Sequence, residues 1–298
     1  MIKNLQETEE EIMGKKHRKT IIFTLIIMIL SVIYYFLQLN WISVTTHIVY
    51  LDDLPKEFDG YKIVQLTDLH NKEFGSENER LVKKINEIQP DMIVMTGDML
   101  TNTRDVANNG DVLIKLLENL NKDYPIYYVT GEHEEGLYYE NTNKYQIEGT
   151  KEDYEEKLSQ LGVTVLNDER TTVTRQDAKI NLYGLKYDFS EEMQIEERLG
   201  KPNEDEVNIL LSHSPFYFDE YADWGADLIF SGDTHGGMIR LPIIGGVIST
   251  EGFFPEYDGG LFNKENSIMV VSRGLGNYPI SLRINNRPEI VEIILKSK

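Results

Sequence analysis

The first part of the chain has an unusually long uncharged segment. Residues 20–51 contain no Asp, Glu, Lys or Arg, and residues 20–40 form an almost continuous apolar run. A helix of this length can cross the hydrocarbon core of a bilayer, which is about 30 Å thick. Tyr34, Tyr35 and Trp41 lie where an interfacial belt of aromatic residues is expected. The pattern therefore predicts a transmembrane anchor at residues 20–40.

Two other interpretations of this run are a buried helix of a soluble domain and a cleaved signal peptide. An uncharged stretch this long rarely belongs to a soluble core, and a signal peptide has a shorter apolar core that ends in small residues. Lys15, Lys16, Arg18 and Lys19 precede the run. Basic residues stay on the cytoplasmic side, so we expect a cytoplasmic tail at residues 1–19. The predicted protein is a single-pass protein of the cell membrane with its large domain outside the cytoplasm.

Beyond the anchor, short apolar runs alternate with amphipathic segments across residues 44–298. Predicted helices cover residues 78–89, 111–120 and 153–162, and the first places Leu81, Ile85 and Ile88 on one face. The predicted strands are the runs KIVQL, MIVM, IYYV, VTVL, INLYGL, NILL, LIF, IMVVS and EIVEIIL, with THIVYL before them. This alternation predicts one α/β domain whose sheets are buried.

Composition narrows the chemistry that such a domain can perform. The chain has no cysteine, which excludes disulfides, thiolate metal sites and a cysteine nucleophile. Its net charge is −20; residues 1–40 hold five Lys or Arg and four Asp or Glu, so the remainder carries −21. An acidic surface without a basic stripe repels polyanions, so nucleic acid is not an expected partner. The simpler explanation of the acidity is solubility.

Five predicted strands end in the same way, in Thr or Ser followed by residues that bind metals. These residues are Asp68 and His70 after KIVQL, Asp98 after MIVM, Glu132, His133 and Glu134 after IYYV, His213 after NILL, and Asp233 and His235 after LIF. Ligands gather at the carboxyl ends of strands in α/β sheets, so these loops can converge on one crevice. In an extended segment positions i and i+2 point the same way, which lets Asp68 and His70 hold one ion. The same spacing applies to Asp233 and His235.

Carboxylate and imidazole ligands without sulfur suit Mn, Fe, Zn or Mg ions. Seven such ligands are too many for one ion and fit two ions that share a bridging Asp. Paired ions about 3.5–4 Å apart activate water and stabilise the attacking and leaving oxygens of a displacement at phosphorus. The other two histidines, His17 and His47, have no partner in the sequence, and we assign them no role.

The order of these motifs resembles the signature of the calcineurin-like metallophosphoesterases. That signature reads D-x-H, GD, GNH(D/E), a lone His and GHTHGG; here it reads DLH, GD, GEHE, SHSP and GDTHGG. The segments DLPKEFDGYKIVQLTDLH and VVSRGLGNYPISLRINNRPEI are similar to a membrane-associated bacterial branch that includes UDP-2,3-diacylglucosamine hydrolases. The resemblance covers roughly residues 44–295, and the motifs are specific only when taken together.

The resemblance implies an α/β fold of two mixed β-sheets packed face to face and flanked by helices. It also implies a role for each matching residue. His133 contacts the substrate phosphate and protonates the leaving oxygen, and Glu134 orients His133. The first metal is held by Asp68, His70, Asp98 and His235, and the second by Asp98 as the bridge with Glu132, His213 and Asp233.

Two positions depart from the family pattern, and both belong to the second metal. Glu132 replaces the usual Asn, and Asp233 replaces the usual first His of the GHTH motif. A decayed site is one explanation, but both replacements are themselves good ligands, so we favour a remodelled one. Carboxylate oxygens shift the preference towards hard ions. The predicted cofactors are two divalent ions, Mn first, with Mg, Fe or Zn as alternatives.

The resulting hypothesis is a membrane-anchored, two-metal phosphoesterase. A metal-bound hydroxide would attack phosphorus in a phosphate ester or diester, either small or lipid-linked, such as an envelope lipid or glycolipid headgroup. The alternatives are a phosphodiesterase or nuclease for soluble nucleotides and a non-catalytic metal-binding envelope scaffold. The sequence leaves open whether four residues of the later loops contact a phosphate or only support the structure: Arg240, Tyr257, Arg273 and Asn277.

Overall fold

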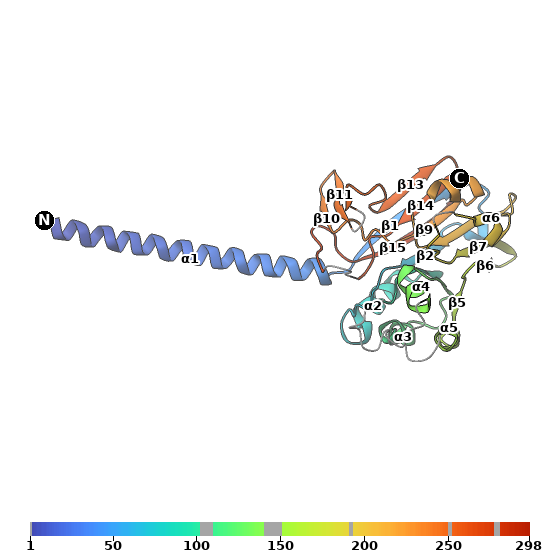
Figure 1. Cartoon of the computed structure of the whole chain (residues 1–298), viewed down its shortest axis with the longest axis horizontal. Coiled ribbons are helices and arrows are strands. Elements are labelled where there is room, and N and C mark those ends of the chain that lie inside the picture. The colour runs from blue at the N-terminus through green and yellow to red at the C-terminus, as the bar shows by residue number, and fades with distance from the viewer. Residues whose placement is uncertain (1, 102–109, 140–150, 191–192, 250–251, 277–280) are drawn as a thin grey trace.

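The N-terminal helix stands apart from the rest of the protein. The computed structural model describes residues 2–101, 110–139, 151–190, 193–249, 252–276 and 281–298. Helix α1 (Ile2–Asn40) projects from one side of a compact body (Figure 1). Its segment Met13–Asn40 is long and apolar enough to cross a membrane, and none of its most apolar window is buried. Strand β1 (Ser43–Leu51) begins after only two further residues.

Two six-stranded mixed sheets form the body. The first has the order β1-β15-β2-β3-β4-β5, in which β2 to β5 are parallel and β15 is antiparallel to β2. The second has the order β13-β14-β9-β8-β7-β6, with parallel pairs from β14 to β7. The further bounds in the first sheet are β2 (Lys62–Leu66), β3 (Met92–Thr96), β4 (Ile126–Val129), β5 (Val163–Val165) and β15 (Glu289–Ser297). Those in the second are β6 (Glu169–Arg175), β7 (Ala178–Leu185), β8 (Asn208–Ser212), β9 (Leu228–Ser231), β13 (Gly260–Lys264) and β14 (Ser267–Val271).

Helices cover the outer faces of both sheets. The inner faces share one apolar core, to which Ile63, Val94, Leu182, Ile209 and Phe230 contribute. A second apolar cluster lies between the first sheet and α2, α3 and α5, and a third lies between the second sheet and α6 and α7. These helices are α2 (Glu79–Ile88), α3 (Asp111–Asn119), α5 (Lys151–Gln160), α6 (Ile195–Leu199) and α7 (Phe218–Trp224). The predicted sandwich of two mixed sheets flanked by helices is confirmed.

The predicted helices and apolar strands are all present, and the face of α2 predicted from its periodicity is buried. The sequence did not reveal several short elements with polar residues or glycine. These are β6, β13, helices α4 (Glu132–Tyr139), α6 and α7, the 3-10 turns Lys56–Phe58 and Ser76–Asn78, and a small sheet of β10 (Ile239–Leu241), β11 (Gly245–Ser249) and β12 (Gly252–Phe253). Each is short or lies at an edge, where a strong apolar period is absent.

The end of α1 is bound to the body by two basic side chains. The last carbonyls of a helix have no partner within the helix and attract positive charge. In this protein the Leu39 carbonyl accepts a hydrogen bond from Lys72 Nζ, and the Asn40 carbonyl accepts one from Arg80 Nη1 at 3.3 Å. The helix therefore ends on the surface of the domain next to the loop that follows β2.

A buried arginine organises the chain between β14 and β15. Arg283 donates to the carbonyls of Arg273 at 3.0 Å, Gly274 at 3.3 Å, Gly276 at 2.6 Å and Asn286 at 3.2 Å. Burial lowers the pKa of its guanidinium to about 10, which leaves it charged at neutral pH. One cation thus satisfies four backbone acceptors, three of them in fully buried contacts.

Replacing Arg283 by Met should strongly destabilise the domain. The substitution keeps the volume but leaves buried carbonyls without donors, at about 1–3 kcal/mol for each group. We expect the free energy of unfolding to fall by about 3 kcal/mol or more, measured by denaturant titration of the full chain in detergent. The control Lys83→Met, on the exposed face of α2, should change it by less than about 0.5 kcal/mol. Equal effects of the two substitutions would contradict this role of Arg283.

Candidate metal centre

The five loops identified in the sequence meet at one edge of the sandwich. Strands β2, β3 and β4 are parallel neighbours in the first sheet, and β8 and β9 are parallel neighbours in the second. Their carboxyl ends therefore open on the same side, as expected for an α/β fold. Seven of the predicted residues are buried there: Asp68, His70, Asp98, His133, Glu134, His213 and His235.

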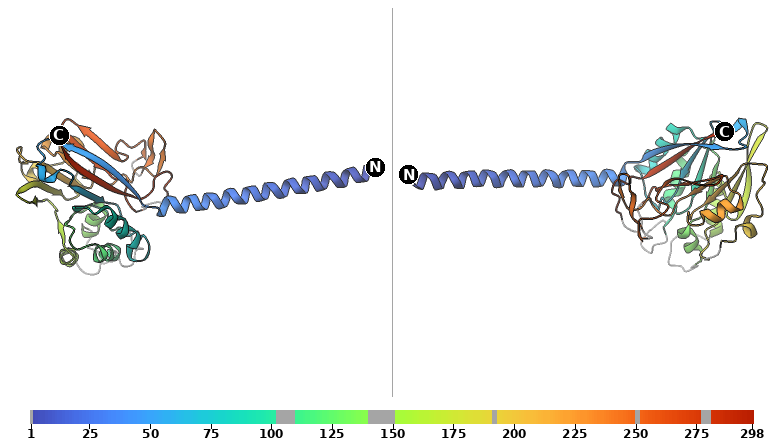
Figure 2. Two further views of the ribbon diagram at one scale, coloured as in Figure 1. Left: turned by 180° about the vertical axis from the view of Figure 1, so that it is seen from behind. Right: turned by 90° about the horizontal axis from the view of Figure 1, so that it is seen from above.

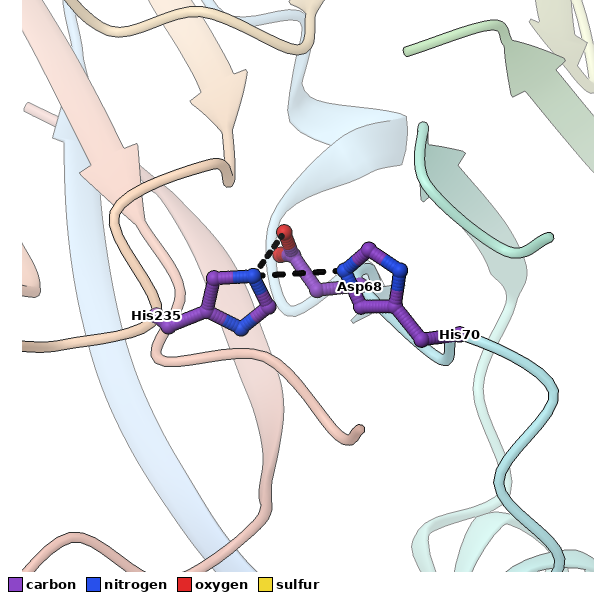
Figure 3. A group of neighbouring side chains, drawn as sticks. All are labelled: Asp68, His70 and His235. Atoms are coloured by element: carbon purple, nitrogen blue, oxygen red, sulfur yellow. Dashed lines mark hydrogen bonds and ion pairs between the residues drawn. The ribbon is translucent and has the colours of Figure 1, made fainter. Parts of the chain in front are cut away.

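Asp68, His70 and His235 form the first group of possible ligands (Figure 3). The Nε2 atoms of the two imidazoles lie 3.2 Å apart, and His235 Nε2 lies 3.6 Å from Asp68 Oδ1. The other carboxylate oxygen, Asp68 Oδ2, is buried and has no hydrogen-bond partner within the described residues. Two ring nitrogens and a carboxylate that face one another in this way suit a shared cation.

Asp98 connects the remaining imidazoles. Its Oδ2 lies 3.3 Å from His213 Nε2, 3.7 Å from His70 Nε2 and 3.8 Å from His133 Nε2. His213 Nδ1 lies 2.6 Å from the Thr96 carbonyl, to which it donates its proton. This hydrogen bond leaves the lone pair on Nε2, the atom that faces Asp98, and so fixes the tautomer that a metal requires.

The backbone at these residues differs from the expectation. Five predicted ligands have a positive φ: Asp68 at 50°, His70 at 47°, Asp98 at 52°, Asp233 at 75° and His235 at 50°. The prediction that an extended segment aligns positions i and i+2 is therefore wrong, although Asp68 and His70 do come together. Left-handed non-glycine residues cost about 1–3 kcal/mol each and cluster at functional sites. The strands stop, and the chain turns sharply to direct these side chains inward.

Glu134 holds the backbone of the site in place. Its carboxylate accepts hydrogen bonds from the backbone N–H groups of Asp98 at 2.9 Å, Leu100 at 2.9 Å and Gly131 at 2.8 Å. In return, Asp98 Oδ1 accepts a hydrogen bond from the backbone N–H of His133 at 2.9 Å. The loops after β3 and β4 are therefore linked in both directions. That Glu134 orients His133 stays a prediction, because these three hydrogen bonds of its carboxylate all come from backbone groups.

Glu132 and Asp233 lie at the margin of the centre. Both are half-buried, and neither belongs to the three groups of close ligand atoms found among the described residues. Glu132 Oε1 is 3.6 Å from His133 Nε2, and the Asp233 backbone N–H donates to Asp68 Oδ1 at 3.2 Å. Their assignment to a second metal remains a prediction.

Tyr187 is a residue of the site that the sequence analysis missed. It follows β7, whose carboxyl end lies beside that of β8. Its ring centroid is 6.1 Å from that of His213. Burial, together with the Glu132 and Asp233 carboxylates, raises the pKa of the Tyr187 phenol, which therefore keeps its O–H donor. Its position at a strand end was the available signal, but Tyr is also a common core residue.

Three residues left open by the sequence have structural partners. Arg240 Nη1 donates to the Gly236 carbonyl at 2.7 Å and pairs with Asp258, and Arg273 pairs with Glu289. The Tyr257 ring packs against Phe262, with 5.1 Å between ring centroids. Asn277 lies outside the described residues.

The protonation of the cluster is consistent with a cation site. Burial raises the pKa of the Asp98 carboxyl, and the Asp98 carboxylate raises the pKa of His213 in spite of that residue's burial, so the two share a proton. Burial lowers the pKa of His235 and of His133 to about 4. A divalent cation needs an ionised carboxylate and neutral imidazoles, so it would replace the proton that Asp98 and His213 otherwise share. The donor types and the orphaned Asp68 Oδ2 together fit such an ion.

Comparison with known proteins agrees with this chemistry. The Calcineurin-like phosphoesterase family matches residues 61–237, more than half of the chain. Metallophosphoesterase YkuE of Bacillus subtilis is 31% identical over 265 residues, which cover 88% of each protein. UDP-2,3-diacylglucosamine pyrophosphatase LpxG of Chlamydia muridarum is 25% identical and covers 80% of this chain and 85% of its own length. Phosphodiesterase YaeI of Escherichia coli is 26% identical and covers 79% and 82%. The chain therefore belongs to the calcineurin-like phosphoesterases, a family of metal-dependent phosphoester hydrolases.

Proposed function

We propose that the protein is a membrane-anchored phosphoesterase that uses two divalent ions to hydrolyse a lipid-linked phosphate ester or diester. The observation that supports it most is the cluster at Asp98, whose Oδ2 faces three imidazole nitrogens at 3.3–3.8 Å. A carboxylate between two sets of ligands is what a bridged pair of ions requires. The cluster lies in a domain that follows a candidate membrane helix after two residues.

The protein side of the reaction can be assigned to individual residues. Asp68, His70 and His235 would hold one ion and His213 the other, and Asp98 would be shared between the two. Glu132 and Asp233, at the edge of the cluster, would complete the second ion's ligands. Bound divalent ions supply Lewis-acid stabilisation of a phosphoryl group and activation of water. We propose Mn first for the two ions because Glu132 and Asp233 would add carboxylate oxygens, which favour hard cations.

His133 is proposed to act on the substrate. Burial lowers its pKa to about 4, and an anionic phosphate beside it would favour the protonated imidazolium. A protonated His133 could then hydrogen-bond the phosphate and give its proton to the departing oxygen. Tyr187, on the loop after a strand of the other sheet, would offer a second hydrogen-bond donor, which is neutral.

The substrate class is inferred from the anchor and from two relatives. LpxG is named for a diacylated sugar nucleotide and YaeI for phosphodiester cleavage. A domain held at a bilayer meets lipid-linked phosphates more readily than dilute soluble ones. Soluble nucleotides are the alternative substrates. The test is a panel of lipid-linked and nucleotide phosphoesters, assayed with and without Mn. Mn-dependent cleavage separates an enzyme from a non-catalytic scaffold, and the preferred substrate separates the two enzymes.

The topology predicts that the catalytic domain is accessible from outside the cell. Four basic residues at 15–19 precede the apolar segment, so the N-terminus should stay in the cytoplasm. Protease added to intact spheroplasts should digest residues 44–298 and leave an N-terminal tag protected. Protection of the domain until lysis would overturn this orientation.

His133→Ala should separate catalysis from metal binding. We expect the variant to keep its bound metal and to lose activity by about 10²–10⁴-fold, the range for one general acid–base group. Metal content by elemental analysis and turnover of a phosphodiester are the two measurements. His47→Ala, a histidine of β1, is the matched control and should retain both. Loss of metal in His133→Ala would show instead that His133 is a ligand.

Reverting Glu132 to Asn and Asp233 to His together should change metal preference. The double variant should gain affinity for Zn relative to Mn, because imidazole replaces a carboxylate. The two changes should be non-additive if they act on one ion. Competition of Mn with Zn and metal stoichiometry are measured for the wild type, each single variant and the double variant.

The control for this series is Asp98→Ala, which should disable both sites because Asp98 is the proposed bridge. A wild type that holds one ion in saturating Mn, while the double variant holds two, would show that the second site has decayed. The two-metal proposal would then be wrong for this protein.

A further inference from the structure

The small sheet of β10, β11 and β12 exposes apolar side chains that nothing in the described chain covers. The residues are Leu241, Ile243, Ile244, Phe253 and Phe254, and the Ile243 side chain is completely exposed. Ile243 also has a φ of 73°, a conformation in which a β-branched residue is strained. A turn between two strands that faces water normally carries Gly, Asn or Asp. This turn carries Pro242, Ile243 and Ile244 instead, which is suited to an apolar environment.

This sheet lies on the side of the domain from which α1 leaves, in all three views (Figures 1 and 2). Contacts connect the two elements. Tyr34 of α1 donates its hydroxyl proton to Asn285 Oδ1 at 2.9 Å, and Asn285 Nδ2 donates to the carbonyl of Arg240 in β10 at 3.3 Å. The adjoining Ile284 forms a parallel bridge with Ile239, the first residue of β10. The apolar sheet is therefore continuous with the end of the membrane helix.

Cationic side chains surround the same end of α1, although the domain as a whole is acidic. Arg80 and Lys84 line a groove of about 220 Å³ together with Phe36 and Trp41. The Arg287 guanidinium lies over the Trp41 ring, 5.7 Å from its centroid. Apolar and aromatic residues flanked by cations are the composition of protein surfaces that rest on anionic lipid headgroups.

We propose that the β10–β12 sheet is a second membrane contact, inserted into the outer surface of the bilayer that α1 crosses. This inference rests on the proposed anchoring of α1. Side chains at the turn would enter the boundary between headgroups and acyl chains, as interfacial segments do to a depth of about 5–10 Å. Strand β10 begins four residues after His235. The second contact would hold the metal centre at the level of the headgroups, where a lipid-borne phosphate is presented.

The absence of native cysteine permits a direct test with the full-length protein. Ile243→Cys is labelled with an environment-sensitive fluorophore, and the protein is reconstituted into liposomes that contain lipids with a nitroxide in the upper acyl chain. Quenching at this position should exceed by about twofold or more that of a label at Asn266→Cys. Asn266 lies in the exposed turn before β14, at the amino end of the strands and opposite the metal centre.

Two further variants make the outcome decisive. Leu30→Cys, in the middle of the apolar segment of α1, reports whether the anchor is in the bilayer, and its quenching is measured with lipids that carry the nitroxide deep in the acyl chain. Ile244→Ser with Phe253→Ser and Phe254→Ser, added to Ile243→Cys, should lower its quenching towards the Asn266 value. Phe189→Ser, another exposed phenylalanine but on the loop after β7, should leave the quenching unchanged.

The outcomes distinguish the two proposals. Quenching at Leu30 with none at Ile243 beyond the Asn266 value would overturn the second membrane contact and leave the anchor intact. Absence of quenching at Leu30 would overturn the anchor itself, and with it the proposed membrane function. Quenching at both positions that is lost with the apolar side chains establishes the contact.

Discussion

Two buried carboxylates, Asp68 and Asp98, impose the main constraint on this structure. An isolated charge is very costly away from water, so each must be protonated, paired or bound to a cation. The two sheets satisfy this by bringing imidazoles from four different loops to within about 4 Å of the carboxylates. The parallel strands of the sandwich, whose carboxyl ends open on one side, make this assembly possible.

The strain of the site is balanced by hydrogen bonds behind it. Left-handed ligand residues would relax if the surrounding backbone were loose. Glu134 fixes the loops after β3 and β4, and Arg283 fixes the loop whose Gly276 N–H donates to the Asp68 carbonyl at 2.5 Å. Both side chains use their polar atoms to hold backbone groups in place. A metal centre of this kind depends on such supports as much as on its ligands.

The sequence predicted those features of the fold and site that leave a strong periodic pattern or that depend on a residue's position at the end of a strand. The apolar strands, the buried face of α2 and the convergence of five loops follow from patterns that tertiary packing does not alter. The sequence did not predict strand β6 or the β10–β12 sheet, because these segments become strands by pairing with their neighbours and their composition does not reveal it. The left-handed turns at Asp68 and Asp98 could not be anticipated, since tertiary contacts alone select that backbone. The direction of Glu132 depends on where α4 begins, which its sequence does not specify.

The two-residue connection between α1 and β1 has a kinetic consequence. The short connection and the binding of the helix end to the domain restrict how the two can move relative to each other. If α1 anchors the protein as proposed, the domain would diffuse within the plane of the membrane without turning over relative to it. Encounters with a lipid-borne substrate would then be collisions in two dimensions. The rate would follow the number of substrate molecules per unit area of membrane, and dilution of the surrounding medium would leave it unchanged.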